Sequence, residues 1–376
     1  MDSYKILLIA RYEGKLLCRN FVFLLLCGFM LLGIVVFHVF LQSDWRVFEY
    51  SVNLPSGMPY ANAYLWGIMQ SFLVIFVVGD FVYRDNIEKT NDVFLARDFS
   101  NLEYLTGKLV GVVVVFLVLN VISMFICMLV HLFASSFRFN VGLYLFYLLT
   151  VSLPALLFMS GLVFMIKIWI KFRFFALTGL VMFLFLSLFV FSTKTLGIFD
   201  FMASRVPHIF SSMVGHPAMG SYLLHRLVFV LVGVGCFVIS VYGFKRLPNN
   251  TGRSRRLGVV GVVFVLLGFL TGWLYWLPHQ VARETRNDWV TIQKKYDAYP
   301  KVKIEQHEIK YDIRGEKILA RSVISVRNSN LFRVDSVIFY LNPSLEVTGV
   351  TAGSHNVNFT RNQQIVVIEK SLHPDE

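Results

Sequence analysis

Two short stretches of this sequence combine residue types that could do chemistry. Residues His307–Tyr311 (HEIKY) begin like H-E-x-x-H, a helical pattern in which two histidines bind zinc and the glutamate acts as a base. Here the fifth position is Tyr311, and the alternation around it predicts a strand, where ligands four residues apart are unsuitably placed. Residues 107–108 (GK) resemble part of a phosphate-binding loop but lack its upstream glycines and its Ser or Thr. We therefore expect no zinc-peptidase centre, no ATP site and no cofactor.

The four cysteines do not form a metal-binding pattern. No two have C-x-x-C spacing, and none is spaced with a histidine as in a zinc site. All lie in or beside apolar runs, so we expect them to act as small apolar side chains: Cys18, Cys27, Cys127 and Cys236.

Composition indicates a membrane protein. Of 376 residues, 56% are hydrophobic and 15% are charged, whereas soluble domains are near half apolar and a quarter charged. The net charge of +12 would suit nucleic-acid binding, but the basic residues gather in alternate connections, as in membrane proteins. We therefore expect membrane lipid as a partner, and no nucleic acid.

Seven apolar runs reach the length of about 20 residues that crosses a hydrocarbon core. The predicted spans are Phe21–Leu41, Ala63–Tyr83, Leu109–Phe133, Val141–Ile170, Phe174–Ser192, Tyr222–Phe244 and Leu257–Leu277. The fourth contains Pro154, which predicts a kink or a tilt.

Polar residues inside these runs are few. The middle of the spans offers mainly Asn120, Ser123, Ser152 and Ser160. The ionisable residues fall near predicted span ends, where long side chains reach the interface by snorkelling: Asp80, His131, Lys167, His225 and Arg226.

The connections set the orientation. Lys and Arg are frequent before the first span and after the second, fourth and sixth spans, while the opposite connections carry only Arg46, Arg138, Lys194 and Arg205. The positive-inside rule then predicts a cytoplasmic N-terminus and a tail from Pro278 on the outside.

Residues 1–20 are predicted to form a basic amphipathic helix in the cytoplasmic interface. Its charged residues are Arg11, Glu13, Lys15 and Arg19. The alternative is a simple flank to the first span.

The polar insert Asp85–Lys108 separates the second and third spans. Asp85 and Glu88 have the spacing of a capping box, which predicts a helix beginning at Asp85. A second short helix is predicted to start near Ser100 or Asn101. Such helices could receive force from a soluble partner, and the alternative is a solvated loop that caps the bundle.

The order of these elements resembles the permease subunits of type-2 ABC transporters. The resemblance covers residues 5–246 and rests on span order, loop lengths and the stretches ARYEGKLLCRN, VVGDFVYRD and TNDVFLARDFSNLEYLTGKLV. The matching residues in the second and third stretches are Asp80, Asp85, Thr90, Phe94, Leu95, Ser100, Asn101, Tyr104, Gly107 and Lys108.

That resemblance implies a six-span permease at residues 21–246, in a bacterial inner membrane, working as a homodimer or heterodimer. A separate ATP-binding subunit would dock on the coupling segment between the second and third spans. The residues implied in this contact are Asp85, Glu88, Thr90, Phe94, Leu95, Arg97, Ser100, Asn101, Tyr104 and Lys108.

Composition changes after the sixth span. Residues 247–277 form a basic linker and the seventh span, with Gly268 and Gly272 as a small-residue pair, and residues 278–301 predict a charged linker helix. From 302 to 376, alternating runs at 303–313, 317–328, 334–342, 345–352, 356–360 and 365–370 predict a small antiparallel sheet or sandwich. The fold class is thus an α-helical polytopic membrane protein with a C-terminal β-domain.

The tail resembles the start of the N-terminal β-domain of aminopeptidase-N-type zinc metallopeptidases. The matching residues are Tyr311, Ile313, Val326, Asn328, the stretch Leu341–Leu345 and the stretch Leu372–Pro374. The H-E-x-x-H motif is missing, so we expect no enzyme activity, and the chain looks like the front part of a permease–peptidase fusion. Two functions remain open: a permease driven by a partner ATPase, or a non-transporting anchor or scaffold for an aminopeptidase-like domain outside the membrane.

Overall fold

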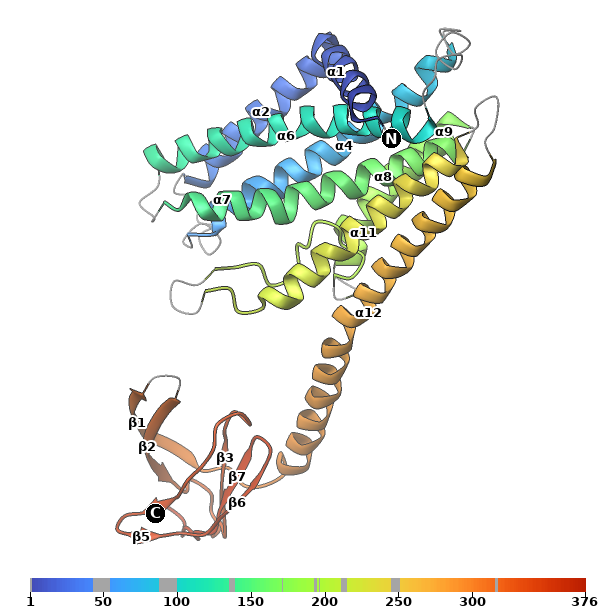
Figure 1. The fold of residues 1–376 in the computed structure, drawn as a ribbon. Coiled ribbons are helices and arrows are strands. Elements are labelled where there is room, and N and C mark those ends of the chain that lie inside the picture. The colour runs from blue at the N-terminus through green and yellow to red at the C-terminus, as the bar shows by residue number, and fades with distance from the viewer. Residues whose placement is uncertain are drawn as a thin grey trace. The chain divides into compact units, whose positions relative to one another are not determined.

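The computed structural model places helices first and strands last along the chain (Figure 1). It describes residues 2–42, 55–87, 100–134, 139–170, 172–192, 195, 197–210, 215–244, 251–314 and 317–376. The chain divides into two compact units, Met1–Leu277 and Pro278–Glu376.

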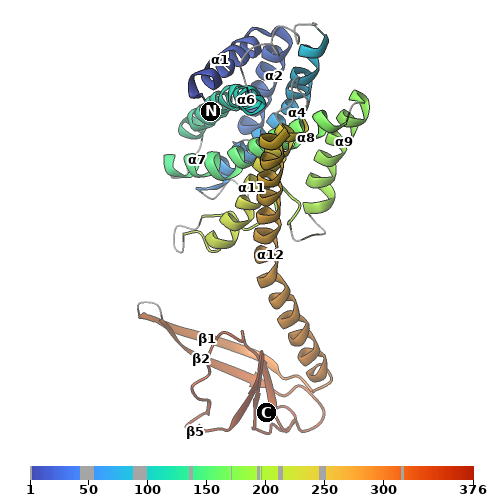
Figure 2. The ribbon, with the colours of Figure 1, turned by 45° about the vertical axis from the view of Figure 1, so that its right-hand side comes forward.

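The helical unit is an assembly of long apolar helices. Their bounds are α1 Ser3–Arg19, α2 Phe21–Gln42, α4 Gly57–Ile87, α6 Asn101–Ala134, α7 Val141–Tyr147, α8 Leu153–Trp169, α9 Arg173–Phe185, α11 Met219–Gly243 and α12 Thr251–Tyr296. Two π-helical segments, η2 at Leu148–Ser152 and η3 at Leu186–Phe191, continue α7 and α9. Figure 1 and Figure 2 both show α1 lying against α6.

Seven helical stretches of the described chain are long and apolar enough to cross a membrane, which confirms the predicted multi-pass character. They are Phe21–Phe40, Gly57–Val78, Asn101–Phe133, Val141–Trp169, Arg173–Phe191, Met219–Gly243 and Arg255–Tyr296. The last differs from prediction because α12 runs through Pro278 as one helix, so the seventh span and the linker helix are continuous.

Glycines let the helices of the membrane-type unit approach closely. A Cβ atom added to Gly161 of α8 would lie 2.0 Å from the carbonyl oxygen of Gly233 of α11. On the other side of α11, a Cβ at Gly261 of α12 would lie 3.0 Å from the carbonyl oxygen of Gly235. Gly268 also faces α11, where its added Cβ would lie 2.6 Å from Val232. The backbones of α8, α11 and α12 are therefore packed side by side.

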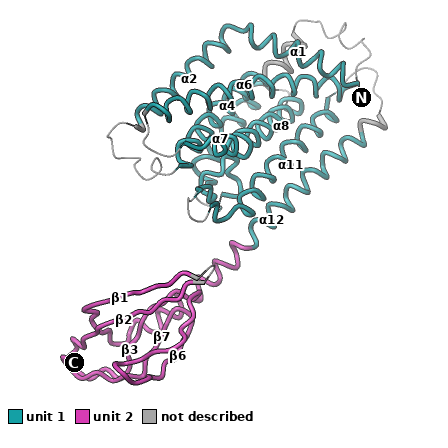
Figure 3. The backbone as a smooth tube through the Cα atoms, turned by 60° about the vertical axis from the view of Figure 1, so that its left-hand side comes forward, with its two compact units in different colours: residues 1–277 teal, residues 278–376 magenta. Residues whose placement is uncertain are grey.

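The second unit, drawn in magenta in Figure 3, holds a small antiparallel β region. Its strands are β1 Lys303–Arg314, β2 Lys317–Arg327, β3 Val337–Tyr340, β4 Thr351–Ala352, β5 His355–Asn356, β6 Phe359–Asn362 and β7 Ile365–Ile368. They pair as β1–β2, β3–β7–β6 and β4–β5, all antiparallel. The buried side chains of this unit are mainly Val334, Val337, Ile365, Val366 and Leu372.

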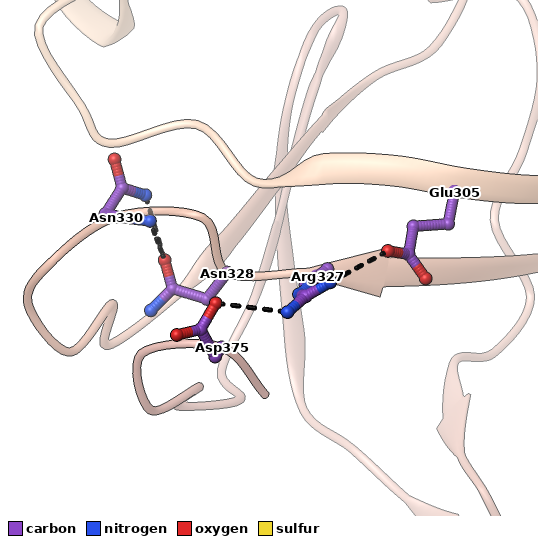
Figure 4. Close-up of polar contacts among 5 residues, drawn as sticks. All are labelled: Glu305, Arg327, Asn328, Asn330 and Asp375. Carbon is purple, nitrogen blue, oxygen red and sulfur yellow. Dashed lines mark hydrogen bonds and ion pairs between the residues drawn. The ribbon is translucent and has the colours of Figure 1, made fainter.

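The buried Asn328 ties the end of β2 to the C-terminal residues. Its side-chain amide donates to the carbonyl oxygens of Phe332 and Leu372, each at 3.0 Å. Its side-chain oxygen accepts from Asn330, and the neighbouring Arg327 lies between two carboxylates (Figure 4). The guanidinium nitrogens are 3.2 Å from Asp375 and 3.9 Å from Glu305. A buried amide satisfied in this way fixes the base of the β1–β2 hairpin.

One predicted strand is largely wrong. Residues 345–350 form no strand, and only Thr351–Ala352 of that run pairs, in β4. The preceding turn is held by Arg361, whose guanidinium donates to the carbonyl oxygens of Asn342, Pro343 and Leu345. The carbonyl of Leu345, the first residue of the predicted run, is thus bonded to a side chain and not to a neighbouring strand.

We predict that Gly161→Ala destabilises the helical unit, because the added methyl group meets the backbone of α11. Overpacking of this kind costs about 1–3 kcal/mol, and it should lower the melting temperature of the purified full chain in detergent. Gly179→Ala in α9 is the matched control, since nothing lies within 4 Å of a Cβ built there. Equal melting temperatures for the two variants would contradict the packing described.

Candidate functional site

Helix α1 is fixed to the N-terminal third of α6, whose first residues, from Asn101 to Lys108, end the predicted coupling segment. A Cβ atom on Gly107 would lie 2.6 Å from Ile9, and one on Gly111 would lie 2.7 Å from the carbonyl oxygen of Ala10. The buried face of α1 consists of Ile9, Ala10, Glu13 and Leu17, while Arg11, Lys15 and Arg19 are exposed. The predicted amphipathic helix therefore exists, and its apolar face packs on α6.

A buried ion pair joins the two helices. The Nζ atom of Lys108 lies 3.1 Å from Oε1 of Glu13, and the two side chains are only 2% and 4% exposed. The same ammonium group lies 5.0 Å from the ring centre of Tyr104. Opposite charges that are excluded from solvent attract each other strongly. Removing one charge of such a pair lowers the stability of the fold, because the other charge stays buried without it.

The start of α6 is closed by a capping box and is bonded to two other parts of the chain. Ser100 and Glu103 form a reciprocal capping box: the Ser100 hydroxyl accepts from the Glu103 amide at 3.2 Å, and the Glu103 carboxylate accepts from the Ser100 amide at 3.0 Å. The second carboxylate oxygen accepts from the Asp2 amide at 2.7 Å, just before α1. Asn101 donates to the carbonyl oxygen of Phe244 at 2.9 Å, which ties α6 to the end of α11.

The capping box predicted at Asp85 is therefore wrong. Asp85 lies inside α4, which continues from the second span to Ile87, so its backbone is helical and cannot act as an N-cap. The second helix does begin at Asn101, as predicted, but it is not a separate short helix, because it continues unbroken through the third span. The structure brings Ser100, Asn101, Tyr104 and Lys108 together at the start of α6. The remaining predicted contact residues lie outside the described residues: Glu88, Thr90, Phe94, Leu95 and Arg97.

A line of polar residues continues along the buried face of α6. We call it the polar stripe: Lys108, Asn120, Ser123, Cys127 and His131, all buried and spaced by three, four, or multiples of these numbers. Apolar Val112 and Phe116 occupy the intervening positions of the same face. The stripe thus extends from the capped start of the helix to its last turn.

The polar side chains of the stripe bond to neighbouring helices. Asn120 donates to Oε1 of Gln70 of α4 at 2.7 Å, and Gln70 donates to the carbonyl oxygen of Ser152 in η2 at 2.9 Å. Ser123 donates to the side chain of Asn62 of α4 at 3.0 Å. His131 Nδ1 and the hydroxyl of Tyr144 of α7 are 2.8 Å apart. Through these bonds α6 is connected to α1, α4, α7 and η2.

A second polar centre surrounds the interruption before α8. Pro154 has no N–H to donate to the carbonyl oxygen four residues earlier, that of Thr150. The Nε atom of Arg226, on α11, donates to this oxygen at 2.6 Å, and a terminal nitrogen lies 3.4 Å from the carbonyl oxygen of Val151. Tyr222, also on α11, places its hydroxyl 2.9 Å from the Thr150 hydroxyl. An irregularity was expected near Pro154, and it takes the form of the π-helical segment η2. Side chains of α11 stabilise this segment.

The snorkelling interpretation is wrong for the ionisable residues that the structure describes. His131, Lys167, His225 and Arg226 are all buried within the helical unit. For example, His225 Nε2 lies 2.8 Å from the carbonyl oxygen of Gly197. The side chain of Asp80 lies outside the described part.

Sequence reasoning missed the buried polar residues His38, Asn62, Gln70 and Glu103, and it named Glu13 without foreseeing its burial. A signal was available for some of them. Asn62 and Gln70 are eight residues apart, which places both on one side of a helix, and Glu13 is an acid on the apolar side of α1.

No metal centre is found among the described residues, where no three His, Cys, Asp or Glu side chains could hold an ion together. The four cysteines are free thiols; Cys27, Cys127 and Cys236 are buried and Cys18 is exposed. The HEIKY stretch lies on β1 as predicted, and His307 Nε2 is 2.7 Å from the Ser322 hydroxyl.

Comparison with known proteins gives no family: no protein-family model matches the chain, and no curated protein matches it significantly.

We predict that Lys108→Met destabilises the full chain by about 3–5 kcal/mol, because it removes the cation beside the buried Glu13 carboxylate. The double variant Glu13→Gln with Lys108→Met removes both charges of this pair, so it should recover much of the loss. Melting in detergent measures both. Lys15→Met, at an exposed position of the same helix, is the control. A double variant no more stable than Lys108→Met alone would contradict the pairing.

We predict that Arg226→Leu loosens η2, because the Thr150 and Val151 carbonyls lose a charged donor worth about 1.5–3 kcal/mol. Hydrogen exchange of residues 148–156 should rise relative to the unmodified chain. Arg205→Leu changes an exposed arginine of the same unit and should leave exchange there unaltered. Unchanged exchange in Arg226→Leu would show that another group satisfies these carbonyls.

Proposed function

We propose that the helical unit is the membrane permease of a transporter driven by a separate ATP-binding subunit, similar to type-2 ABC transporters. Residues 21–246 would form the six-span permease, and a second permease, identical or related, would complete the transport path. The chain would lie in a bacterial inner membrane with α1 on the cytoplasmic side and the β unit outside.

The start of α6 is the observation that carries this proposal. It is the last part of the segment proposed to dock on the partner, and it is fixed to α1 by a buried ion pair and to Asp2 by a capping carboxylate. A helix end held so firmly moves together with its neighbours, whereas a solvated connecting loop requires no such anchoring.

The polar stripe supports the next step. Force applied at the start of α6 would reach α4, α7 and η2 through the side chains of Asn120, Ser123 and His131. Rigid helices linked by polar bonds are the physical basis on which a permease can rock between inward and outward access.

The β unit fits the beginning of an aminopeptidase-N-type β-domain. Two of the matching segments contact each other, because the amide of Asn328 donates to the carbonyl oxygen of Leu372. A third, Leu341–Leu345, forms the turn held by Arg361. The competing function, a non-transporting anchor for this domain, predicts no ATP-binding partner, and that difference can be tested.

We predict that Phe94→Asp with Leu95→Asp abolishes co-purification with the ATP-binding subunit, because two apolar docking side chains become charged. The measurement is the amount of that subunit recovered with the tagged full chain from membranes. The control is Leu331→Asp with Phe332→Asp, which alters an exposed Leu–Phe pair of the β unit.

Recovery of the complex at the unmodified level in the Phe94–Leu95 variant would reject the docking segment. So would labelling of the Phe94→Cys variant from outside intact spheroplasts, because the segment must face the cytoplasm. Absence of any ATP-binding protein in the unmodified preparation would favour the anchor.

A further inference from the structure

The buried guanidinium of Arg226 keeps one nitrogen without a hydrogen-bond partner. Its Nε and Nη2 atoms donate to the carbonyl oxygens of Thr150 and Val151, at 2.6 and 3.4 Å. Its Nη1 atom bonds to nothing in the described part of the chain, although the residue is only 3% exposed. A buried donor that bonds to no acceptor is costly, and a charged donor is more costly still.

A second donor without a partner lies near the first. The hydroxyl of Tyr60, in the first turn of α4, is buried and bonds to no described residue. Its ring meets that of Tyr147 edge to face, with 5.5 Å between the ring centres, where α7 leads into η2. Tyr60 and Arg226 also interact electrostatically. The two unpartnered donors therefore border the same part of η2, and such a pair requires an explanation.

Both donors are fixed in place by their neighbours. The ring of Tyr60 stacks on the rings of Tyr64 and His208, with interplanar angles of 24° and 16°. Arg226 is fixed by its two carbonyl bonds, and Tyr222, one turn earlier on α11, is bonded to η2 at 2.9 Å. Donors that are held in position before a ligand arrives form a preorganised binding site.

The nearby acid Asp200 does not fill this site. It interacts with Arg226 electrostatically, but the two residues form no ion pair among the described contacts. Its Oδ1 atom accepts from the Met202 amide at 3.0 Å. Its Oδ2 atom accepts from the amide and the hydroxyl of Ser204, at 2.7 and 2.5 Å. The Asp200 carboxylate is thus bonded within its own turn, and Arg226 has no anionic partner in direct contact in the described part of the chain.

We propose that Nη1 of Arg226 and the hydroxyl of Tyr60 bind the carboxylate group of a small organic acid. A guanidinium nitrogen only donates, so the ligand must supply an acceptor, and a carboxylate offers one oxygen to each of the two donors. The site has a single cation with the acid Asp200 nearby, which favours a monoanion over a dianionic phosphate. The surrounding rings, among them Tyr147 and Tyr222, suit an aromatic or apolar body.

The site lies near the end of the helical unit at which α4 and α11 begin. Tyr60 follows Gly57, the first residue of α4, by three positions, and Arg226 follows Met219, the first residue of α11, by seven. Seven residues of helix span about 10 Å, which is the depth of the site from that end. In the orientation proposed above, this end faces the outside. Binding here requires no ATP-binding subunit, so the inference goes beyond the transport proposal and can fail separately from it.

Benzoate tests the site in the purified full chain in detergent. A ligand that binds the folded state raises its melting temperature in a saturable way, and benzoate combines a carboxylate with an aromatic body. We expect half-saturation in the low-millimolar range, as for other ligands of this size. In the same mildly alkaline buffer, the neutral benzamide should give no saturable shift, and the dianionic phenylphosphonate should bind more weakly. Sodium chloride at equal ionic strength accounts for general salt effects.

Three variants separate the site from the fold. Tyr60→Phe keeps the ring and removes only the hydroxyl, so the benzoate concentration at half-saturation should rise about tenfold or more. Arg226→Gln should abolish the saturable shift. Tyr144→Phe is the matched control, because its hydroxyl lies 2.8 Å from His131 instead, and it should leave half-saturation unchanged. If Arg226→Gln does not fold, Tyr60→Phe decides the question.

The proposal is overturned if benzoate gives no saturable shift in the unmodified chain, which would leave a water molecule as the partner of both donors. It is also overturned if benzamide matches benzoate, if phenylphosphonate binds more tightly, or if Tyr60→Phe keeps the unmodified half-saturation. Equal losses in Tyr144→Phe and Tyr60→Phe would reject it as well, because the effect would then belong to the fold in general.

Discussion

Polar groups buried inside an apolar helical unit must be satisfied by the protein itself, and this constraint determines how these helices pack. In hydrocarbon no water is present to bond a free carbonyl or to solvate a charge, and each unsatisfied group costs several kcal/mol. The Glu13 carboxylate and the Lys108 ammonium meet this requirement together, at 3.1 Å. The Thr150 carbonyl, which Pro154 leaves without its usual helical donor, meets it through Arg226. In both cases the partner comes from a distant part of the chain.

These pairs therefore act as constraints on tertiary arrangement. The first requires α1 to lie along α6, and the capping carboxylate of Glu103 repeats that requirement through Asp2. The second requires α11 to face η2, where Tyr222 adds another bond to Thr150. Between them, the polar stripe joins α6 to α4 and α7. Apolar packing alone would leave the rotation of each helix about its axis weakly defined, whereas a polar bond fixes it.

The sequence was most informative where a single strong signal acts over many residues. Length and hydropathy located all seven membrane-type helices, and alternation located the hairpin strands from Lys303 onward, because these patterns average over long windows. Helix ends and the partners of individual side chains were harder to predict from the sequence. The Asp85–Glu88 spacing satisfies a capping rule, but the apolar helix before it continues past Asp85, while the working cap forms at Ser100 and Glu103. By its position in the sequence, Arg226 was interpreted as an interfacial residue. Only the fold shows that it lies beside the Thr150 carbonyl, which Pro154 leaves without a helical donor and which accepts from Arg226.

The glycine contact between α8 and α11 has a consequence for motion. With Gly161 and Gly233 in backbone contact, neither helix can slide or rotate past the other without collision, so the two form one rigid block. Helix α12 joins the same block through Gly235 and Gly261. Any large rearrangement of this unit must then occur along seams where longer side chains separate the helices, such as the one between α2 and α6, where the rings of Phe23 and Phe116 meet edge to face.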